Sequence, residues 1–216
     1  MTLQEIHKEY DELQIKYGEP NLKAVYGGGY ENEPNVLFIF MNPTATNLAS
    51  CESWKGINAP FLGTKNVFKL LFNLNLLDEH IYTSIINKKN KDWTEDFAKK
   101  VYDNIKDSKI YITNLAKCTQ IDAKSLKNEV FNEYLSLLEE EIKLVNPKKI
   151  ICFGNQVSSI FLGKDIKVSQ VRGKEFIKTI KDKTFKTYSV YYPIGLGFRN
   201  IDKVMEDLNK ILRGDL

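Results

Sequence analysis

Short apolar segments alternate with longer amphipathic segments along this chain, and that alternation limits the fold more than any other feature of the sequence. Four segments have the length and the apolar or β-branched content of buried strands, at residues 35–40, 109–115, 148–154 and 185–193. Strands that alternate with helices form a mostly parallel sheet with helices on both faces. We therefore predict an α/β fold, a three-layer α/β/α sandwich with a central, mostly parallel, four-stranded sheet.

Helical periodicity marks most of the chain between these strands. The apolar positions from Leu3 to Tyr17 recur at the spacing of one helix face. Asn155 is expected to cap a later helix at its start, and Gly214 is expected to end the last one. The expected helices cover residues 3–17, 66–78, 91–107 (a helix or an insertion), 128–147, 155–163 and 200–214, whereas residues 178–186 are expected to form an exposed turn.

The composition suits one globular domain over residues 1–216, because 43% of the residues are apolar and 27% are charged. The net charge of +3 neither requires nor excludes a nucleic-acid partner, since a local basic patch matters more than the total. No apolar run approaches the ~20 residues of a membrane helix, and the charged N-terminus does not resemble a secretory signal. Cys51, Cys118 and Cys152 are far apart, which favours free thiols. We expect a cytoplasmic monomer that does not bind membranes.

Polar residues stand where three of the predicted strands end. Asn42 and Pro43 follow the first strand, Asn114 lies at the end of the second, and Tyr192 lies at the end of the last. In a parallel sheet these ends meet at one edge, which is where ligands bind. An asparagine amide can hold a water or read the edge of a base, and Pro43 biases Asn42 towards an extended conformation. Taken singly, each segment is more typical of a strand that enters an ordinary turn, and the occurrence of three together weakens that interpretation.

Six segments, in order, resemble motifs of the uracil-DNA glycosylase superfamily over roughly residues 35–212. The segment "FMNPT" is similar to its first motif, in the Asn-Pro form of the mismatch-specific and single-strand-selective branches. The segments "APFLGTKNVFKLLFNLNLLDE", "IYITNLAKC", "NPKKIICFGNQVSSIFLG" and "VRGKEF" resemble the iron–sulfur branch, and "VYYPIGLGFRN" resembles the final His-Pro motif. The resemblance implies the three-layer fold and an enzyme that acts on DNA.

The resemblance also implies a role for individual residues. Asn42 would position the water that attacks the sugar, and Tyr192 would occupy the catalytic position of the last motif. Phe61 would stack on a flipped base, Asn114 would read its edge, and Met41 would complete the base-binding group. Flipping is needed because a base inside a duplex is out of reach. The residues expected to contact DNA are Lys65, Lys117, Arg172, Lys174, Phe198 and Arg199.

The implied function is that of a monofunctional DNA glycosylase of base-excision repair. It would hydrolyse the N-glycosidic bond of uracil or another deaminated base in DNA, with no lyase step. Phe61 could instead be an ordinary core or loop aromatic residue, and the basic residues could form a solvated surface of mixed charge. The alternative function is that of a nucleobase-binding or nucleic-acid-binding member that has lost turnover.

Several positions depart from the family pattern. Tyr192 stands where the family has His or Asn before Pro, and Thr44 replaces the usual Gly. Asn42 cannot act as a base, so it could only orient a water. Cys118 matches one ligand of the iron–sulfur branch, but a second ligand position falls near Phe131, and such a cluster generally takes four thiolates. We therefore expect no metal and no cofactor.

Overall fold

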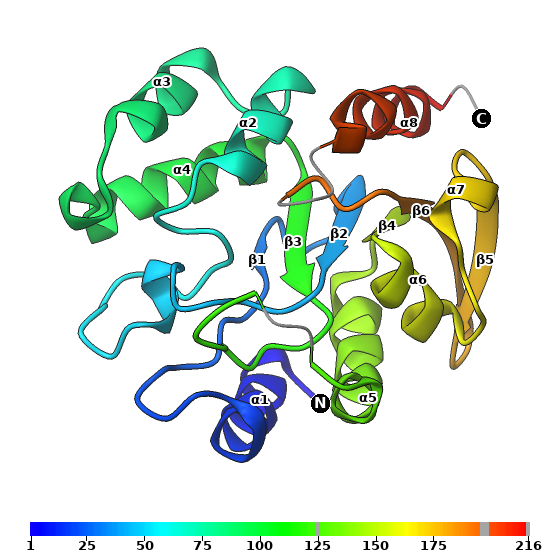
Figure 1. The fold of residues 1–216 in the computed structure, drawn as a ribbon, viewed down its shortest axis with the longest axis horizontal. Helices are drawn as coiled ribbons and strands as arrows, with labels where there is room; N and C mark the ends of the chain where they lie inside the picture. The colour runs from blue at the N-terminus through cyan, green and yellow to red at the C-terminus, as the bar shows by residue number, and fades with distance from the viewer. Residues whose placement is uncertain (124–125, 195–198, 215–216) are drawn as a thin grey trace.

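Apolar strands form a central mixed sheet in the computed structural model, which describes residues 1–123, 126–194 and 199–214 (Figure 1). Within these residues the sheet has six strands in the order β1-β3-β2-β4-β6-β5. Neighbouring strands among β3, β2, β4 and β6 pair in parallel, and β1 and β5 are antiparallel edge strands. The strands are β1 (Gly28–Gly29), β2 (Val36–Phe40), β3 (Ile110–Asn114), β4 (Lys149–Phe153), β5 (Glu175–Ile180) and β6 (Lys183–Val190).

The predicted fold class is confirmed, and the prediction of four strands is corrected by the two edge strands. One of them, β1, consists of only two glycines, which gave no apolar signal. The other, β5, forms a hairpin with β6 where an exposed turn was expected at residues 178–186. Its residues alternate between exposed and partly covered positions, as an edge strand does, and the lysines spread over residues 178–186 of the hairpin made it look like a loop.

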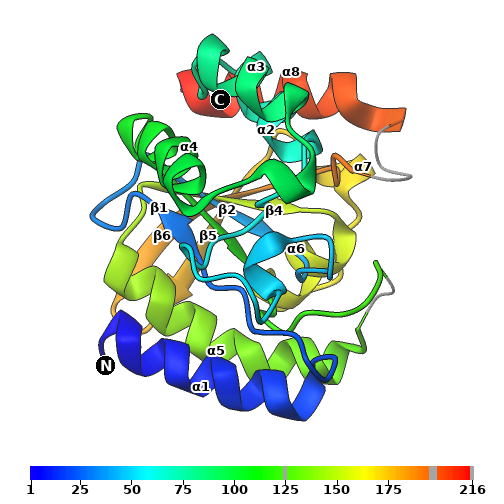
Figure 2. The same cartoon turned by 90° about the vertical axis from the view of Figure 1, so that its left-hand side faces the viewer.

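Helices cover both faces of the sheet, because residues along each central strand point alternately to opposite sides. In β2, Phe38 and Phe40 belong to one apolar core, and Leu37 and Ile39 belong to the other. Figure 2 shows α1 and α5 on one side of the sheet and α2, α3 and α8 on the other. The helices are α1 (Leu3–Tyr17), α2 (Asn66–Asn73), α3 (Glu79–Asn87), α4 (Glu95–Asp107), α5 (Asn128–Val145), α6 (Asn155–Leu162), α7 (Val168–Val171) and α8 (Ile201–Arg213).

Several helix boundaries differ from expectation, and α4 begins at Glu95 rather than at residue 91. The segment 66–78 contains α2 only as far as Asn73, and Asn75 turns the chain with a φ of 57°. Gly154, rather than Asn155, caps the start of α6, while the Asn155 amide oxygen accepts a hydrogen bond from the backbone N–H of Val168. Across the described residues, no helix combines the length and apolarity that a membrane crossing requires.

Hydrogen bonds join the chain segments that leave β2 and β3 at the same edge. The backbone N–H groups of Leu115 and Ala116 donate to the carbonyls of Phe40 and Met41, at 2.7 and 3.0 Å. The parallel pairing thus continues past the last strand residues. On the other side of β2, the Gly154 N–H donates to the Val190 carbonyl at 2.8 Å. The polar residues after these strands are therefore held on one rim.

Candidate functional site

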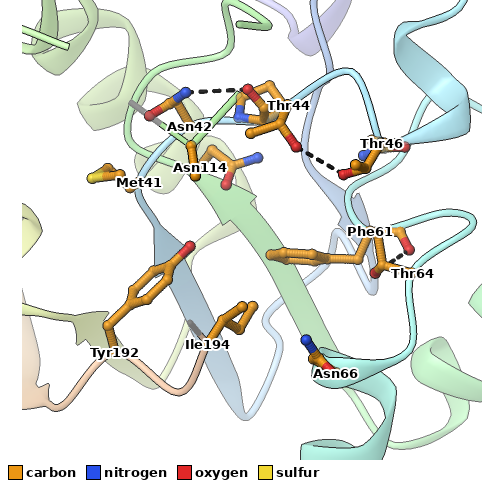
Figure 3. Close-up of a pocket in the computed structure, with 13 residues that line it drawn as sticks. Met41, Asn42, Thr44, Thr46, Phe61, Thr64, Asn66, Asn114, Tyr192 and Ile194 are labelled. Carbon is orange, nitrogen blue, oxygen red and sulfur yellow. Dashed lines mark hydrogen bonds between the residues drawn. The ribbon is translucent and has the colours of Figure 1, made fainter. Parts of the chain in front are cut away.

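A cavity of about 610 Å³ opens at this rim, where β2, β3 and β6 end (Figure 3). It brings together five residues that the sequence places far apart and predicts as site residues: Met41, Asn42, Phe61, Asn114 and Tyr192. The remaining lining residues are Pro43, Thr44, Thr46, Asn47, Thr64, Asn66, Ala123 and Ile194. Apolar walls with a few polar groups are typical of a site that binds a small organic molecule.

Asn42 lines this cavity and carries an unpaired, buried acceptor. Its Nδ2 donates to the Pro43 carbonyl at 3.1 Å, which fixes the rotation of the amide. Its Oδ1 is buried and has no hydrogen-bond partner among the described residues. Because a buried polar atom without a partner is costly, such an atom in a folded protein needs an explanation. Because Oδ1 is closed to solvent, a water or substrate hydroxyl can donate to it only after the Asn42 side chain or its neighbours move.

Phe61 reaches into the cavity from an unusual backbone conformation. Its φ is 63°, in the left-handed region that costs a bulky side chain of order 1–3 kcal/mol. The Thr64 hydroxyl and the Thr64 N–H both donate to the Phe61 carbonyl, at 2.7 and 3.0 Å, and hold the turn. The Phe61 ring packs edge-on against Phe40, with ring centres 4.8 Å apart. The Phe61 ring, held in place by these contacts, therefore forms one wall of the cavity.

Asn114 is the last residue of β3 and is almost fully buried. Its carbonyl accepts a hydrogen bond from Lys117, whereas its side-chain amide makes none with any residue in the described ranges. Figure 3 shows that amide extending into the cavity between Asn42 and Phe61. An amide carries a donor and an acceptor side by side, so it can match a complementary pair on a ligand edge.

Tyr192 stands on the opposite wall, two residues after β6. Its ring contacts Phe40 edge-on at 6.2 Å, and Figure 3 shows its hydroxyl pointing towards Asn114. Burial raises the pKa of Tyr192 to about 12, so the hydroxyl keeps its proton at neutral pH and can donate. Gly154 lies beside this residue, and a Cβ there would be in van der Waals contact with the Tyr192 Cβ, at 3.4 Å.

Lys117 is a correction to the predicted DNA contacts. Its side chain is fully buried, and its Nζ lies 2.9 Å from Glu141 Oε2 on α5. It offers no charge at the surface, so it is not placed to contact a phosphate. The sequence carried a signal for the burial of Glu141, although not for its partner, because Glu141 lies with Leu138, Ile142 and Val145 on the apolar face of its helix. A lone carboxylate on such a face requires a buried partner.

The other residues predicted to contact DNA differ from one another in exposure and in ion pairing. Lys65, Lys174 and Arg199 are exposed, although the Lys65 ammonium donates to the Ile86 carbonyl. Arg172 is paired with Asp207 at 2.9 Å and Glu206 at 2.8 Å on α8, which neutralises much of its charge. Phe198 lies outside the described residues.

Sequence reasoning missed the hydroxyl and amide groups on the loops around the cavity. Thr44 and Thr46 hydrogen-bond to each other through their hydroxyls at 2.8 Å, and Asn66 begins α2 at the rim. These residues lie outside the strand ends where ligand sites are usually sought. Only the folding of the loop 42–66 back over the sheet brings them to the cavity.

The cysteines do not fit an iron–sulfur cluster. The chain has three cysteines, and such a cluster generally takes four thiolates. Cys118 and Cys152 are buried, and burial raises the pKa of both thiols, whereas Cys51 is exposed. Within the described ranges no three His, Cys, Asp or Glu side chains are grouped for a metal ion.

Comparison with models of protein families identifies the family of this chain. Residues 28–213 match the family model described as the uracil DNA glycosylase superfamily, and this range covers most of the chain and every residue that lines the cavity. No curated protein matches the sequence.

Proposed function

The chain belongs to the uracil DNA glycosylase superfamily, and from this premise we propose that it is a monofunctional DNA glycosylase that removes uracil or another deaminated base. Membership by itself supports a glycosylase-like activity on DNA. The finer proposal depends on one observation, which is that Asn42, Phe61, Asn114 and Tyr192 converge on a single cavity. The base would leave the stack and enter this cavity, as enzymes that act on bases require.

Binding of the base would use the aromatic ring and the free amide. Stacking on Phe61 contributes about 1–3 kcal/mol for one base. Asn114 can donate to a ring carbonyl and accept from the neighbouring ring N–H of a uracil-like edge. A base with a different pattern would leave the buried amide unpaired, and this penalty is the larger source of discrimination.

Cleavage of the N-glycosidic bond would use two other polar groups of the cavity, Tyr192 and Asn42. The bond between the sugar C1′ and the base nitrogen breaks, and the base leaves with the electron pair while positive charge develops on the sugar. The Tyr192 hydroxyl is a neutral donor that can stabilise the negative charge on the departing base. A rotation of the Asn42 side chain would let its buried Oδ1 accept a hydrogen bond from a water, and the lone pair of that water would then face C1′. The water oxygen bonds to C1′, and its proton passes to solvent or to the base.

The products are a free base and an intact strand with an abasic site. Among the described residues that line the cavity there is no lysine to form a Schiff base with the sugar, which supports the absence of a lyase step.

A strand-cleavage assay tests this proposal. Oligonucleotides that contain uracil, hypoxanthine or xanthine are incubated with the protein and then treated with alkali, which cuts at abasic sites. We expect a cut only after alkali with at least one base, and none with Asn42→Ala combined with Tyr192→Phe. An intact strand with every base contradicts the proposal.

A second function is supported by Tyr192, which stands where the family has His or Asn. In this alternative the protein binds a nucleobase or nucleic acid without turnover. Tight DNA binding that weakens steeply with salt, together with no base release, is the result that favours it.

A further inference from the structure

A closed network of polar side chains lies beneath the base-reading end of β3, on the side away from the cavity. Glu141 of α5 accepts hydrogen bonds from Tyr10, Tyr111 and Thr113 at 2.7, 2.9 and 2.9 Å, and it is paired with Lys117. The Lys117 ammonium also donates to the Thr113 hydroxyl at 2.8 Å and to the Asn114 carbonyl at 2.5 Å. Each of its three protons therefore has an acceptor.

The surrounding chain is shaped to admit this network. A Cβ on Gly27 would lie 2.5 Å from Glu141 Oε1 and 2.2 Å from the Tyr111 hydroxyl, so only glycine allows the backbone to pass this close. The Lys117 ammonium also lies 4.8 Å from the centre of the Tyr10 ring, at the distance of a cation–π contact. Helix α1, helix α5 and strand β3 thus contribute to one buried cluster.

Stability alone does not account for a buried ion pair of this kind. Removing two charges from water costs several kcal/mol per ion, and apolar residues of similar volume are often as stabilising. The rest of this core is apolar, with Leu138, Ile142 and Leu115 close by in the same cluster. The network instead fixes the positions of its side chains, because a buried network whose hydrogen bonds are satisfied is rigid.

That geometry acts on Asn114. Lys117 reaches back three residues to the Asn114 carbonyl, while the next two N–H groups donate to Phe40 and Met41. The peptide that follows the Asn114 Cα is therefore held on both sides. We propose that Lys117, anchored by Glu141, is a positioning residue that sets the direction of the Asn114 amide in the base pocket. This inference rests on the proposed function, in which Asn114 reads the base.

The test removes both charges together, so that neither is left unpaired in the core. In Lys117→Met/Glu141→Gln we expect a melting temperature near that of the unchanged protein. Activity on the best base should nonetheless fall about 10²-fold in kcat/KM, since a misplacement of ~1 Å has effects of this size. The matched control is Lys16→Met/Glu133→Gln, which makes the same substitutions in an exposed pair between α1 and α5. It should retain activity within twofold.

The preference among bases separates positioning from a loss of folded protein. Partial unfolding lowers kcat/KM by the same factor for every base. A displaced Asn114 lowers kcat/KM for the preferred base more than for the others. In the double variant we expect two changes together: a lower kcat/KM on the preferred base, and a smaller ratio of that value to the kcat/KM on the second-best base. A folded double variant with unchanged rate and ratio overturns the inference and leaves the proposed function standing. Should the double variant not fold, Tyr10→Phe loosens Glu141 from the far side; a several-fold loss supports the inference, and an unchanged rate overturns it.

Failure of the proposed function has a different signature. If the unchanged protein releases no base, the inference is decided by the side-chain amide signal of Asn114 in a ¹H–¹⁵N spectrum, assigned by its loss in Asn114→Ala. The signal should shift in Lys117→Met/Glu141→Gln and stay in place in Lys16→Met/Glu133→Gln. A signal that stays in place in both variants overturns the inference.

Discussion

Phe40 and Asn114 are paired in register at the ends of the adjacent parallel strands β2 and β3. Phe40 contacts the rings of both Phe61 and Tyr192, and Asn114 extends its amide into the same cavity between Asn42 and Phe61. The pair of strands β2 and β3 therefore positions both aromatic walls of the cavity, through Phe40, and its polar group, Asn114. Asn42 follows two residues after Phe40, so the proposed water-binding and base-reading amides are set by the same register.

Asn42→Ala should lower kcat about 10²-fold with little change in KM, because a water loses its orientation while the base still binds. Asn42→Asp keeps an acceptor oxygen and adds a base. Burial raises the pKa of such a carboxyl above its ordinary value of about 3.9, so its activity should increase as pH rises through that pKa. Single-turnover rates of base release between pH 5 and 9 measure both effects. An unchanged rate in Asn42→Ala contradicts the role of Asn42.

Tyr192→Phe retains the ring and removes the donor, so kcat should fall about 10²–10³-fold. The unchanged protein should show no loss of this donor between pH 6 and 9, because the Tyr192 pKa is raised to about 12 and the proton is lost only as pH rises through that value. Tyr192→His should instead gain activity as pH falls through the imidazole pKa, which burial lowers below its ordinary value of about 6.5, because the imidazolium charge then forms opposite the departing base. A pH–rate profile of the unchanged protein and of each variant measures these differences. Equal rates for the unchanged protein and Tyr192→Phe contradict the role of Tyr192 as a donor to the departing base.

Phe61→Ala should weaken binding of a base-containing oligonucleotide by about 1–3 kcal/mol, which is the stacking contribution of one ring. Phe61→Trp retains an aromatic face and should retain most of the affinity. Alanine has the same difficulty with the positive φ of this position, so the backbone strain is similar in both variants. Fluorescence titration with a labelled oligonucleotide measures the difference. Equal affinities for the two variants would indicate that Phe61 only fills the core.

Gly154→Ala and Gly163→Ala form a matched pair, because both glycines have positive φ, at 90° and 66°. Each substitution should destabilise the fold, by about 1–3 kcal/mol at Gly154 and about 1–2 kcal/mol at Gly163. Only the first adds a methyl against Tyr192, since a Cβ on Gly163 meets nothing within 4 Å. We expect a lower kcat in Gly154→Ala alone when both variants are assayed well below their melting temperatures. Equal kcat values would show that Tyr192 tolerates the contact.

The central strands and the amides at their ends were predictable because they depend on local patterns. A run such as residues 36–40 is apolar at every position, which is expected only when both faces are covered. The proline after Asn42 ends that run at a polar residue, and Asn114 ends the next. Parallel pairing then predicts their shared edge without knowledge of any side-chain contact.

The edge strands and the fate of individual charges were not predictable in this way. Polar and charged residues of β5 (Glu175–Ile180) look the same in a solvated turn and in a strand that covers the sheet margin on one side only. Arg172 is one of several basic residues near the predicted motifs, and its pairing partners are more than 30 residues away on α8.

The sequence by itself determined the layered α/β architecture, the motif order and the strand-end amides, because apolar periodicity and the restriction that proline imposes are properties of neighbouring residues. Only the tertiary structure decided that Lys117 faces the core rather than DNA, and that Phe61 and Tyr192 close the same cavity. The reason is physical: a charged or aromatic side chain has nearly the same local preferences in either setting, and its environment is set by residues distant in the chain, such as Glu141 and Phe40.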